Sequence, residues 1–401
     1  MYRLYILLLI CFGISSPVLG QSGCTDPAAT NYDSHAVVND GSCLYPITHI
    51  TVTRRADLPS ELVETSGLKY ISGRIWSHGD SGNPSELYAV DTTSCSLLQK
   101  IVVDNCSNID WESITADDSN IYVGDMGNNS GDRTDLRILK IAKSDISASS
   151  TVHLNSQVIH FAYADQTNFS LGSSNNYDCE AMISLRDSLY IFTKDRGDTS
   201  TRVYKLPKTP GTYSVSPITS YHVHGLITDA DYDSVTNSVI LLGYMPAHNY
   251  SFLWLLYDFN SVDFFSGNKR RLEIGDVNAW HTEGLTRVNK HRMFISNESS
   301  GSVSQALWIA DFEQAGLDAS LLHHEQLPIS FHPNPASDVL TFENISMPST
   351  IEIYDVLGRK LKCLQMTSGQ KEMDIKGMVS GVYIVSVENK EGRQVSQMVK
   401  Q

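Results

Sequence analysis

One residue pattern recurs five times between residues 47 and 325, and it limits the folds that this chain can adopt. Each copy has a small or acidic pair, an apolar residue, a short polar gap and a strand-like run that ends in polar residues. The copies begin at Thr65, Asp110, Asp178, Asp229 and His281, and their strand-like runs occupy 75–80, 121–125, 189–195, 239–244 and 293–298. Neighbouring copies start roughly 45 to 70 residues apart, which is the length of a four-stranded propeller blade.

The same region has no long helical period. It consists of short β-branched and aromatic runs separated by Gly, Asn, Asp and Ser, which are typical of strands and turns. These features predict an all-β chain with a β-propeller of about five blades over residues 47–325. The wide spacing between the second and third copies leaves a sixth, degenerate blade open.

Residues 1–20 have the form of a secretory signal peptide. A basic Arg3 precedes an apolar run over 4–14, and small and turn-forming residues lead to Gln21, as in cleaved signals. The run is too short to span a bilayer stably, and no later stretch approaches the needed length. We therefore expect an exported protein whose mature form has no transmembrane segment.

Residues 21–46 place Cys24 and Cys43 around a run rich in Asp, Asn and Gly. A disulfide between them would supply the constraint that this segment's small core cannot. The Asp and Asn oxygens are suited to calcium, and an Asx-rich turn without metal is the alternative. The segment resembles the GCTDPxAxNY…DGSC modules of secreted proteins of Bacteroidota, and the resemblance implies an extracellular setting.

Residues 326–401 carry alternating strand patterns at 339–342, 351–354 and 382–387. Alternation of this kind predicts a small immunoglobulin-like β-sandwich. The motifs PNPASD, IEIYDVLGRKL and SGVYIVSV and a basic tail follow in an order that resembles the C-terminal sorting domain of type IX secretion cargo. That resemblance implies export by the type IX secretion machinery to the medium or the outer cell surface, followed by removal of the domain. An ordinary immunoglobulin-like appendage is the alternative.

Alignment of the five copies places one oxygen-bearing side chain per blade at the same position: Ser66, Glu112, Glu180, Asp231 and Glu283. The first strand of each blade lines the channel of a propeller, so we expect these residues to form a ring. Carboxylates that converge in a channel take up protons or need a cation between them. Calcium suits such an oxygen ring. Alternatively, each residue caps a neighbouring blade or faces the solvated rim.

The ring resembles that of the calcium-activated nucleotidase (apyrase-type) five-bladed propellers, in which serine and glutamate side chains hold one central calcium. The resemblance rests on blade number and ring positions over about 280 residues, rather than on continuous identity. It implies a calcium ion in the channel. Asp231 departs from the pattern because its side chain is shorter than that of glutamate.

A second set of polar residues is expected around the channel mouth, in the loops that open on one face of the propeller. They are His78, Asp80, Asp125, Asn128, Arg133, Lys194, Arg196, His281, Asn297 and Glu298. Basic side chains beside a metal can bind a phosphate or carboxylate group, and Asp110 or Glu298 could orient a water molecule. Ordinary polar turns at strand ends are the alternative.

The net charge of −15 argues against nucleic acid as a partner, because phosphate backbones are bound by basic surfaces. The sequence has no GxSxG elbow, HExxH motif or phosphate-binding glycine loop. Two functions remain. The first is a calcium-containing module that binds an extracellular glycan, protein or anionic ligand, and the alternative is a calcium-dependent hydrolase of a phosphoester or another anionic small molecule.

Overall fold

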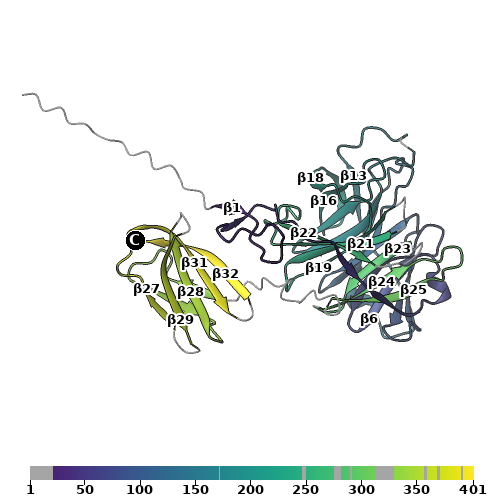
Figure 1. Ribbon diagram of the computed structural model, residues 1–401. Helices are drawn as coiled ribbons and strands as arrows, with labels where there is room; N and C mark the ends of the chain where they lie inside the picture. Colours follow the sequence, from purple (N-terminus) through teal and green to yellow (C-terminus); the bar gives the residue numbers. More distant parts are fainter. Residues whose placement is uncertain are drawn as a thin grey trace, which may run out of the picture. The chain divides into compact units, whose positions relative to one another are not determined.

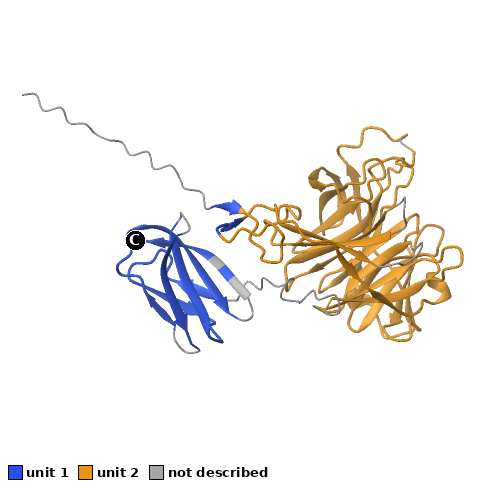
Figure 2. Cartoon of the chain, viewed as in Figure 1, with its two compact units in different colours: residues 1–22, 35–38, 327–401 blue, residues 23–34, 39–326 orange. Residues whose placement is uncertain are grey.

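The structure is a computed structural model. It describes residues 21–170, 172–245, 250–274, 281–289, 291–312, 329–355, 359–367, 371–389 and 392–401. The predicted signal peptide lies outside the described residues. The chain divides into two compact units, each with many more contacts within itself than with the other, and Figure 2 colours them differently. The larger unit comprises 23–34 and 39–326, and the smaller comprises 1–22, 35–38 and 327–401.

The described part of the larger unit contains five sheets of four or five strands, which we call blades 1 to 5 (Figure 1). Blade 1 consists of β5 (Thr65–Ile71), β6 (Arg74–Gly79), β7 (Glu86–Asp91), β8 (Leu97–Val103) and β12 (Thr151–Leu154). Blade 2 consists of β9 (Trp111–Ala116), β10 (Asn120–Asp125), β11 (Arg137–Ala142), β13 (Gln157–Tyr163) and β17 (Gly211–Val215). Blade 3 consists of β14 (Cys179–Leu185), β15 (Ser188–Thr193), β16 (Thr201–Pro207) and β18 (Pro217–Tyr221).

Blades 4 and 5 are completed by strands from the beginning of the chain. Blade 4 consists of β19 (Leu226–Asp233), β20 (Ser238–Met245), β21 (Tyr250–Tyr257), β22 (Asn268–Ile274) and β3 (Thr48–Ile50). Blade 5 consists of β23 (Thr282–Arg287), β24 (Arg292–Asn297), β25 (Ala306–Asp311) and β4 (Val52–Asp57). Because β4 pairs antiparallel with β25, early and late segments of the chain share one sheet.

The first strands of the five blades contact one another in a closed order, β5, β9, β14, β19, β23 and β5 again. This is the arrangement of a five-bladed propeller, so the predicted all-β propeller fold is confirmed. The chain between the second and third copies adds outer strands to blades 1 and 2, which explains the wide spacing. It contains a short 3-10 turn, η2 (Lys143–Asp145), then β12, which runs parallel to β8 of blade 1, and β13 of blade 2.

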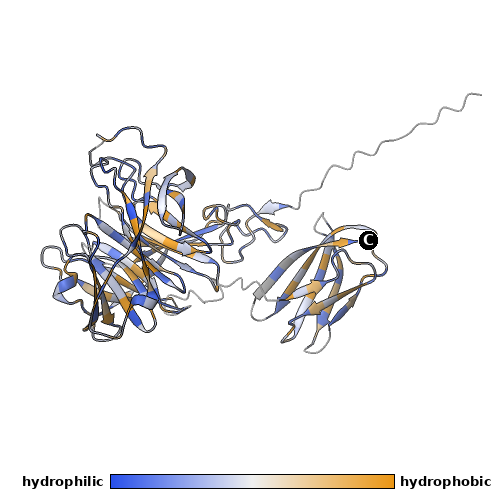
Figure 3. Cartoon of the chain, turned by 180° about the vertical axis from the view of Figure 1, so that it is seen from behind, coloured by the Kyte–Doolittle hydropathy of each residue, from blue (hydrophilic) through white to orange (hydrophobic). Residues whose placement is uncertain are grey.

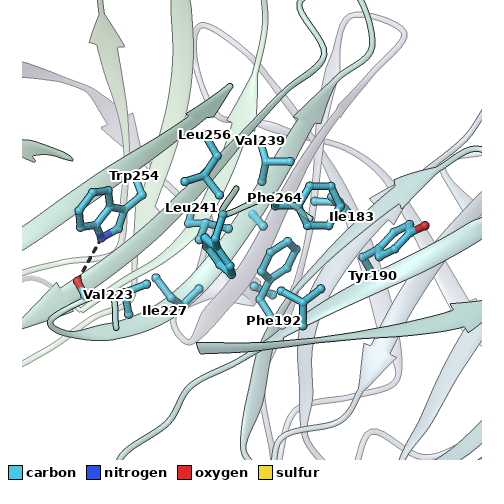
Figure 4. Packing of buried hydrophobic residues seen from close by; sticks show 14 of the residues in the cluster. Ile183, Tyr190, Phe192, Val223, Ile227, Val239, Leu241, Trp254, Leu256 and Phe264 are labelled. Atoms are coloured by element: carbon cyan, nitrogen blue, oxygen red, sulfur yellow. Dashed lines mark hydrogen bonds between the residues drawn. The ribbon is translucent and has the colours of Figure 1, made fainter. Parts of the chain in front are cut away.

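The core lies between the blades because the inner strands are covered on both faces. In β15, for example, every residue from Leu189 to Thr193 is buried, whereas the outer β22 alternates buried and half-buried side chains. Figure 4 shows Ile183 and Phe192 of blade 3 beside Leu241 of blade 4, with Phe264 packed among them. Apolar burial between sheets is the main stabilising contribution to such a fold.

The N-terminal segment is bound to blade 4. Its short strands β1 (Ser22–Gly23) and β2 (Val38–Asn39) pair with each other, and the predicted disulfide joins Cys24 and Cys43. The hydroxyl of Tyr257 on β21 donates a hydrogen bond to Asp26 Oδ2 at 2.7 Å. The segment is therefore attached to the propeller as well as closed by its own disulfide. One further 3-10 turn, η1 (Ser60–Leu62), precedes blade 1.

The smaller unit contains a two-sheet β-sandwich, the predicted fold of this region. One sheet consists of β26 (Ser330–His332), β27 (Val339–Glu343) and β30 (Glu372–Asp374). The other consists of β29 (Lys360–Met366), β28 (Ser349–Asp355), β31 (Gly381–Asn389) and β32 (Gly392–Lys400). Hydrophobic and hydrophilic segments alternate along these strands (Figure 3), and the inward side chains of Phe342, Ile351 and Ile353 are fully buried. One face of each sheet therefore forms the core.

Candidate functional site

A cavity of about 220 Å³ lies where the inner strands of the propeller end. It is lined by Thr65, Ser66, Asp80, Glu112, Asn129, Glu180, Lys194, Arg196, Tyr244, His281, Glu283 and Glu298. Four of the five predicted ring residues and five of the ten predicted mouth residues are in this set. The structure therefore brings together side chains that are more than 200 residues apart in the sequence.

β-Bulges place three of the four glutamates that line the cavity. The register of the first strand shifts at Glu112 in blade 2, at Glu180 in blade 3 and at Glu283 in blade 5. A bulge adds one residue to a strand and redirects its side chain. The same local irregularity, repeated in three blades, therefore directs three carboxyl groups to one cavity.

Blade 4 departs from the predicted alignment. Its bulge lies at Thr228, between Ile227 and Asp229, and the Thr228 hydroxyl donates to the carbonyl oxygen of Thr282 at 2.7 Å. Asp231 lies further along β19, where its carboxylate accepts hydrogen bonds from Lys69 Nζ and from the backbone N–H of Arg287. The expectation that Asp231 joins the other four ring residues is therefore corrected.

The three glutamates at the bulges have different partners. Glu112 accepts a hydrogen bond from the Ser66 hydroxyl at 3.0 Å, and Glu180 forms a buried ion pair with Lys194. Glu283 is 9% exposed, and within the described residues its carboxylate has no hydrogen-bond or ion-pair partner. A buried carboxylate without a partner is costly unless a proton or a cation neutralises it.

Lys194 and Arg196 are the permanently charged cations of the cavity. The ammonium group of Lys194 lies 5.1 Å from the ring centroid of Tyr244, a cation–π contact. Arg196 bonds Asp178 through one nitrogen and lies 3.7 Å from Glu180 Oε1 through another. Burial alone would lower the pKa of Lys194, but Glu180 and Glu283 outweigh burial and raise it, so the ammonium stays charged.

Burial and mutual repulsion raise the pKa of several acidic groups at this site. Burial and the neighbouring Glu64 raise the pKa of Asp80 to about 7. Burial together with Glu180 raises the pKa of Glu112 well above its usual value. Asp110 is outside the cavity lining, and burial and Asp178 raise its pKa to about 6. Perturbed carboxyl groups in a cavity are typical of functional sites, although structural networks also produce them.

His281 and Glu298 form the blade 5 wall of the cavity. His281 Nδ1 lies 2.7 Å from Glu298 Oε1, and the imidazole stacks parallel to the Tyr244 ring, with the ring centroids 5.9 Å apart. The Glu298 backbone N–H donates to the His281 carbonyl oxygen at 3.1 Å. His281 is therefore held by Tyr244 and Glu298, and Glu298 is held by the backbone and the imidazole of His281.

The other five predicted mouth residues lie outside the cavity lining: His78, Asp125, Asn128, Arg133 and Asn297. Asp125 is fully buried between Arg133 and Arg137, each 2.9 Å away. The Asn128 backbone N–H donates to Asp178 Oδ1, and the Asn297 side-chain amide donates to backbone carbonyl groups in its own blade. His78 packs edge-on against Trp111. Polar strand ends here satisfy backbone groups, as the alternative interpretation of the sequence expected.

Tyr244 and Thr65 line the cavity but were not predicted as site residues. Tyr244 lies near the end of β20, a place that corresponds to Lys194 after β15 and Glu298 after β24. The position relative to the strand end was therefore the available signal, but the predicted set contains acidic, basic, amide and histidine side chains from such positions and no tyrosine.

Residues 330–401 match the family model described as the secretion system C-terminal sorting domain. This is a secreted or outer-surface protein. The match supports export as type IX secretion cargo and implies contact with the type IX machinery. No helix in the described part of the chain has the length and hydropathy of a membrane span. The comparison with curated proteins found no match.

Several solved structures are distantly similar to this chain. A glucose dehydrogenase has 8% identity and a TM-score of 0.38, over 64% of this chain and 98% of that one. The extracellular domain of a one-component system from B. thetaiotaomicron has 11% identity and a TM-score of 0.30, over 84% of this chain and 57% of that one. Hydrazine synthase of Kuenenia stuttgartiensis has 10% identity and a TM-score of 0.32, over 74% of this chain and 78% of that one. This low similarity gives no information about function.

Proposed function

We propose that the cavity binds a calcium ion and, beside it, an anionic ligand, so that the secreted propeller acts as a binding module. The observation that carries this proposal is the charge imbalance of the cavity. Among the described residues, five carboxyl groups line it, against two permanently charged cations, Lys194 and Arg196. Glu180 is already neutralised by Lys194, whereas Glu283 has no partner among the described residues.

The donor atoms that remain favour calcium. Glu112 and Glu283 offer carboxylate oxygens, and Ser66 offers a hydroxyl oxygen, a set of hard ligands that suits calcium at variable coordination number. The resemblance to the calcium-activated nucleotidase propellers points the same way, through Ser66, Glu112, Glu180 and Glu283. In this chain Lys194 competes for Glu180, so we assign the ion to the other three residues and water.

The same cavity supports recognition of an anionic group. The side chain of Arg196 is 23% exposed. Its guanidinium has five N–H donors, so it can still bind a carboxylate or phosphate group beside its contacts with Asp178 and Glu180. A volume of about 220 Å³ is smaller than a typical small-molecule pocket. The ligand is therefore proposed to enter only by a terminal acidic group, such as that of an acidic glycan.

A calcium-dependent hydrolase is the second candidate, and the pKa of Asp80 favours it. A carboxyl group with a pKa of about 7 can accept or donate a proton at neutral pH. A cation and Arg196 in the same cavity would stabilise negative charge on a phosphoester. Asp80 is then the group that would take the proton from an attacking water.

The two candidates are separated by testing binding and turnover on one panel of sugar acids and phosphate esters, with calcium present. A binding module predicts affinity without turnover, a loss of at least about tenfold in affinity in Arg196→Gln, and no change in the exposed control Arg55→Gln. A hydrolase predicts turnover that Asp80→Asn abolishes while calcium affinity persists. If no member of the panel binds or reacts, both candidates are rejected.

A further inference from the structure

We propose that His281, Glu283 and Glu298, all of blade 5, form a second metal site that takes a transition-metal ion of the zinc class. Their ligand atoms all lie within 4.8 Å of one another. This site extends the proposed function, because Glu283 also belongs to the oxygen set assigned to calcium. The calcium site and the zinc site differ in His281, because calcium prefers oxygen ligands whereas zinc readily binds imidazole nitrogen.

The three residues converge through the architecture of one blade. His281 immediately precedes β23, Glu283 occupies the bulge of β23, and Glu298 immediately follows β24. The backbone hydrogen bond from Glu298 to His281 fixes the two strand ends together. The ligand set therefore needs no rearrangement of the chain to assemble.

Glu283 indicates that an ion belongs here, through the same lack of a hydrogen bond or close ion pair that supports the calcium proposal. Its side chain is nine-tenths buried, it lines the cavity, and within the described residues its carboxylate has no hydrogen bond and no ion pair within 4.0 Å. Glu112 differs because it accepts the Ser66 hydroxyl, and Glu180 differs because it pairs with Lys194. The carboxylate that lacks a partner is thus the one that lies beside an imidazole and a second carboxylate.

The donor types determine the class of metal. One imidazole nitrogen with two carboxylate oxygens is a ligand set suited to zinc and its neighbours in the first transition row. Zinc bound at about 2.0–2.2 Å holds its ligand atoms about 3.3 Å apart. That value lies between the 2.7 Å that separates His281 Nδ1 from Glu298 Oε1 and the 4.8 Å within which all three ligand atoms lie. Three protein ligands leave the fourth position for water or an acidic ligand group.

The surroundings allow entry and hold the imidazole in place. The His281 side chain is 43% exposed, so an ion can reach it from solvent. The Tyr244 ring lies parallel to the imidazole, with the ring centroids 5.9 Å apart. The 2.7 Å contact between His281 Nδ1 and Glu298 Oε1 shows that the two donor atoms already approach one another.

The test uses full-length protein without a histidine tag, treated with a chelator and then titrated with zinc or with cobalt. We expect one equivalent of zinc to bind, and cobalt to give a visible absorption band that zinc abolishes. His281→Gln is expected to lower the zinc affinity by at least about 100-fold and to abolish the cobalt band. The matched control is His222→Gln, because His222 and His224 form another imidazole pair, with centroids 4.1 Å apart.

Calcium titrations separate this inference from the proposed function. His281→Gln is expected to keep its calcium affinity, whereas Glu112→Gln is expected to lose calcium affinity and keep zinc. If zinc does not bind, or if His222→Gln rather than His281→Gln removes it, the zinc site is rejected while the calcium proposal stands. If neither variant nor the parent protein binds calcium, the calcium proposal falls and the zinc result is judged by itself. Tryptophan fluorescence checks that each variant is folded.

Discussion

The hydroxyl of Ser66 donates a hydrogen bond to Oε2 of Glu112 at 3.0 Å, across the junction between blades 1 and 2. The same hydroxyl lies 3.1 Å from the Glu112 carbonyl oxygen. Two positions that the sequence pattern treats as equivalent are therefore in direct contact. This contact joins neighbouring blades and also positions a carboxylate that we assign to calcium.

We predict that Ser66→Ala destabilises the propeller by about 1 kcal/mol without calcium, the value of one hydrogen bond, and by more when calcium is present. Urea unfolding followed by tryptophan fluorescence measures this, because all five tryptophans lie between residues 76 and 308. The control is Ser60→Ala, in the η1 turn. An equal loss with and without calcium would remove Ser66 from the ligand set.

His78 makes the propeller sensitive to acid. Burial lowers the pKa of His78 to about 4 from its usual 6.5. Between these values the unfolded chain binds a proton that the folded chain does not, so stability falls as the pH drops below 6.5, and the loss is complete below about 4. The shift corresponds to about 3 kcal/mol.

The measurement for His78 is the free energy of unfolding of parent protein and His78→Gln at pH 8 and at pH 4. The parent protein is expected to lose about 3 kcal/mol more than the variant between these pH values. The two proteins are compared by the change in their free energy of unfolding between pH 8 and pH 4, because the substitution also alters packing against Trp111 at every pH. Identical pH dependence in the two proteins contradicts the assignment.

Tyr257 holds the disulfide-closed segment against blade 4. Its hydroxyl donates to Asp26 Oδ2, which also accepts the Tyr45 hydroxyl at 2.8 Å. Tyr257→Phe removes a bond to a charged acceptor, worth about 1.5–3 kcal/mol, and is expected to expose residues 21–46 to proteolysis. Mass spectrometry of limited digests checks this, with Tyr32→Phe as an exposed control. Equal digestion rates would show that other contacts hold the segment.

The β4 strand closes the propeller, because it pairs with β25 along the edge of blade 5. Removing residues 21–46 leaves β4 in place and is expected to preserve the cooperative unfolding transition. Removing residues 21–57 exposes the edge of β25 and is expected to yield unfolded or aggregated protein. A cooperative transition in the longer deletion would show that blade 5 is stable with three strands.

The sequence pattern identified the inner strands and three cavity glutamates because one motif encodes both features. In Asp110–Ile114 and Asp178–Met182, the glutamate follows the strand start by a constant interval, and the bulge falls on it. In blade 4 the interval differs, because the bulge lies at Thr228, before the acidic pair Asp229 and Asp231. A bulge leaves no residue signature of its own, so the fourth position could not be aligned from composition.

The mouth residues show a second limit of prediction from sequence. Asp125 and Lys194 both come at the end of a second strand and are equally polar. Two arginines of blade 2 cover Asp125, whereas Lys194 reaches Glu180 inside the cavity. Which polar strand end faces the cavity depends on its side-chain partners on neighbouring strands and turns of the same blade, and the sequence pattern does not show these pairings.

The central claim is a calcium ion in the propeller cavity, and calorimetric titration of chelator-treated protein tests it most directly. We predict one bound calcium, an affinity at least about tenfold weaker in Glu283→Gln and Glu112→Gln, and an unchanged affinity in Asp231→Asn and in Asp187→Asn, an exposed turn residue of blade 3. Absence of calcium binding to the parent protein, or an equal loss in all four variants, would contradict the account.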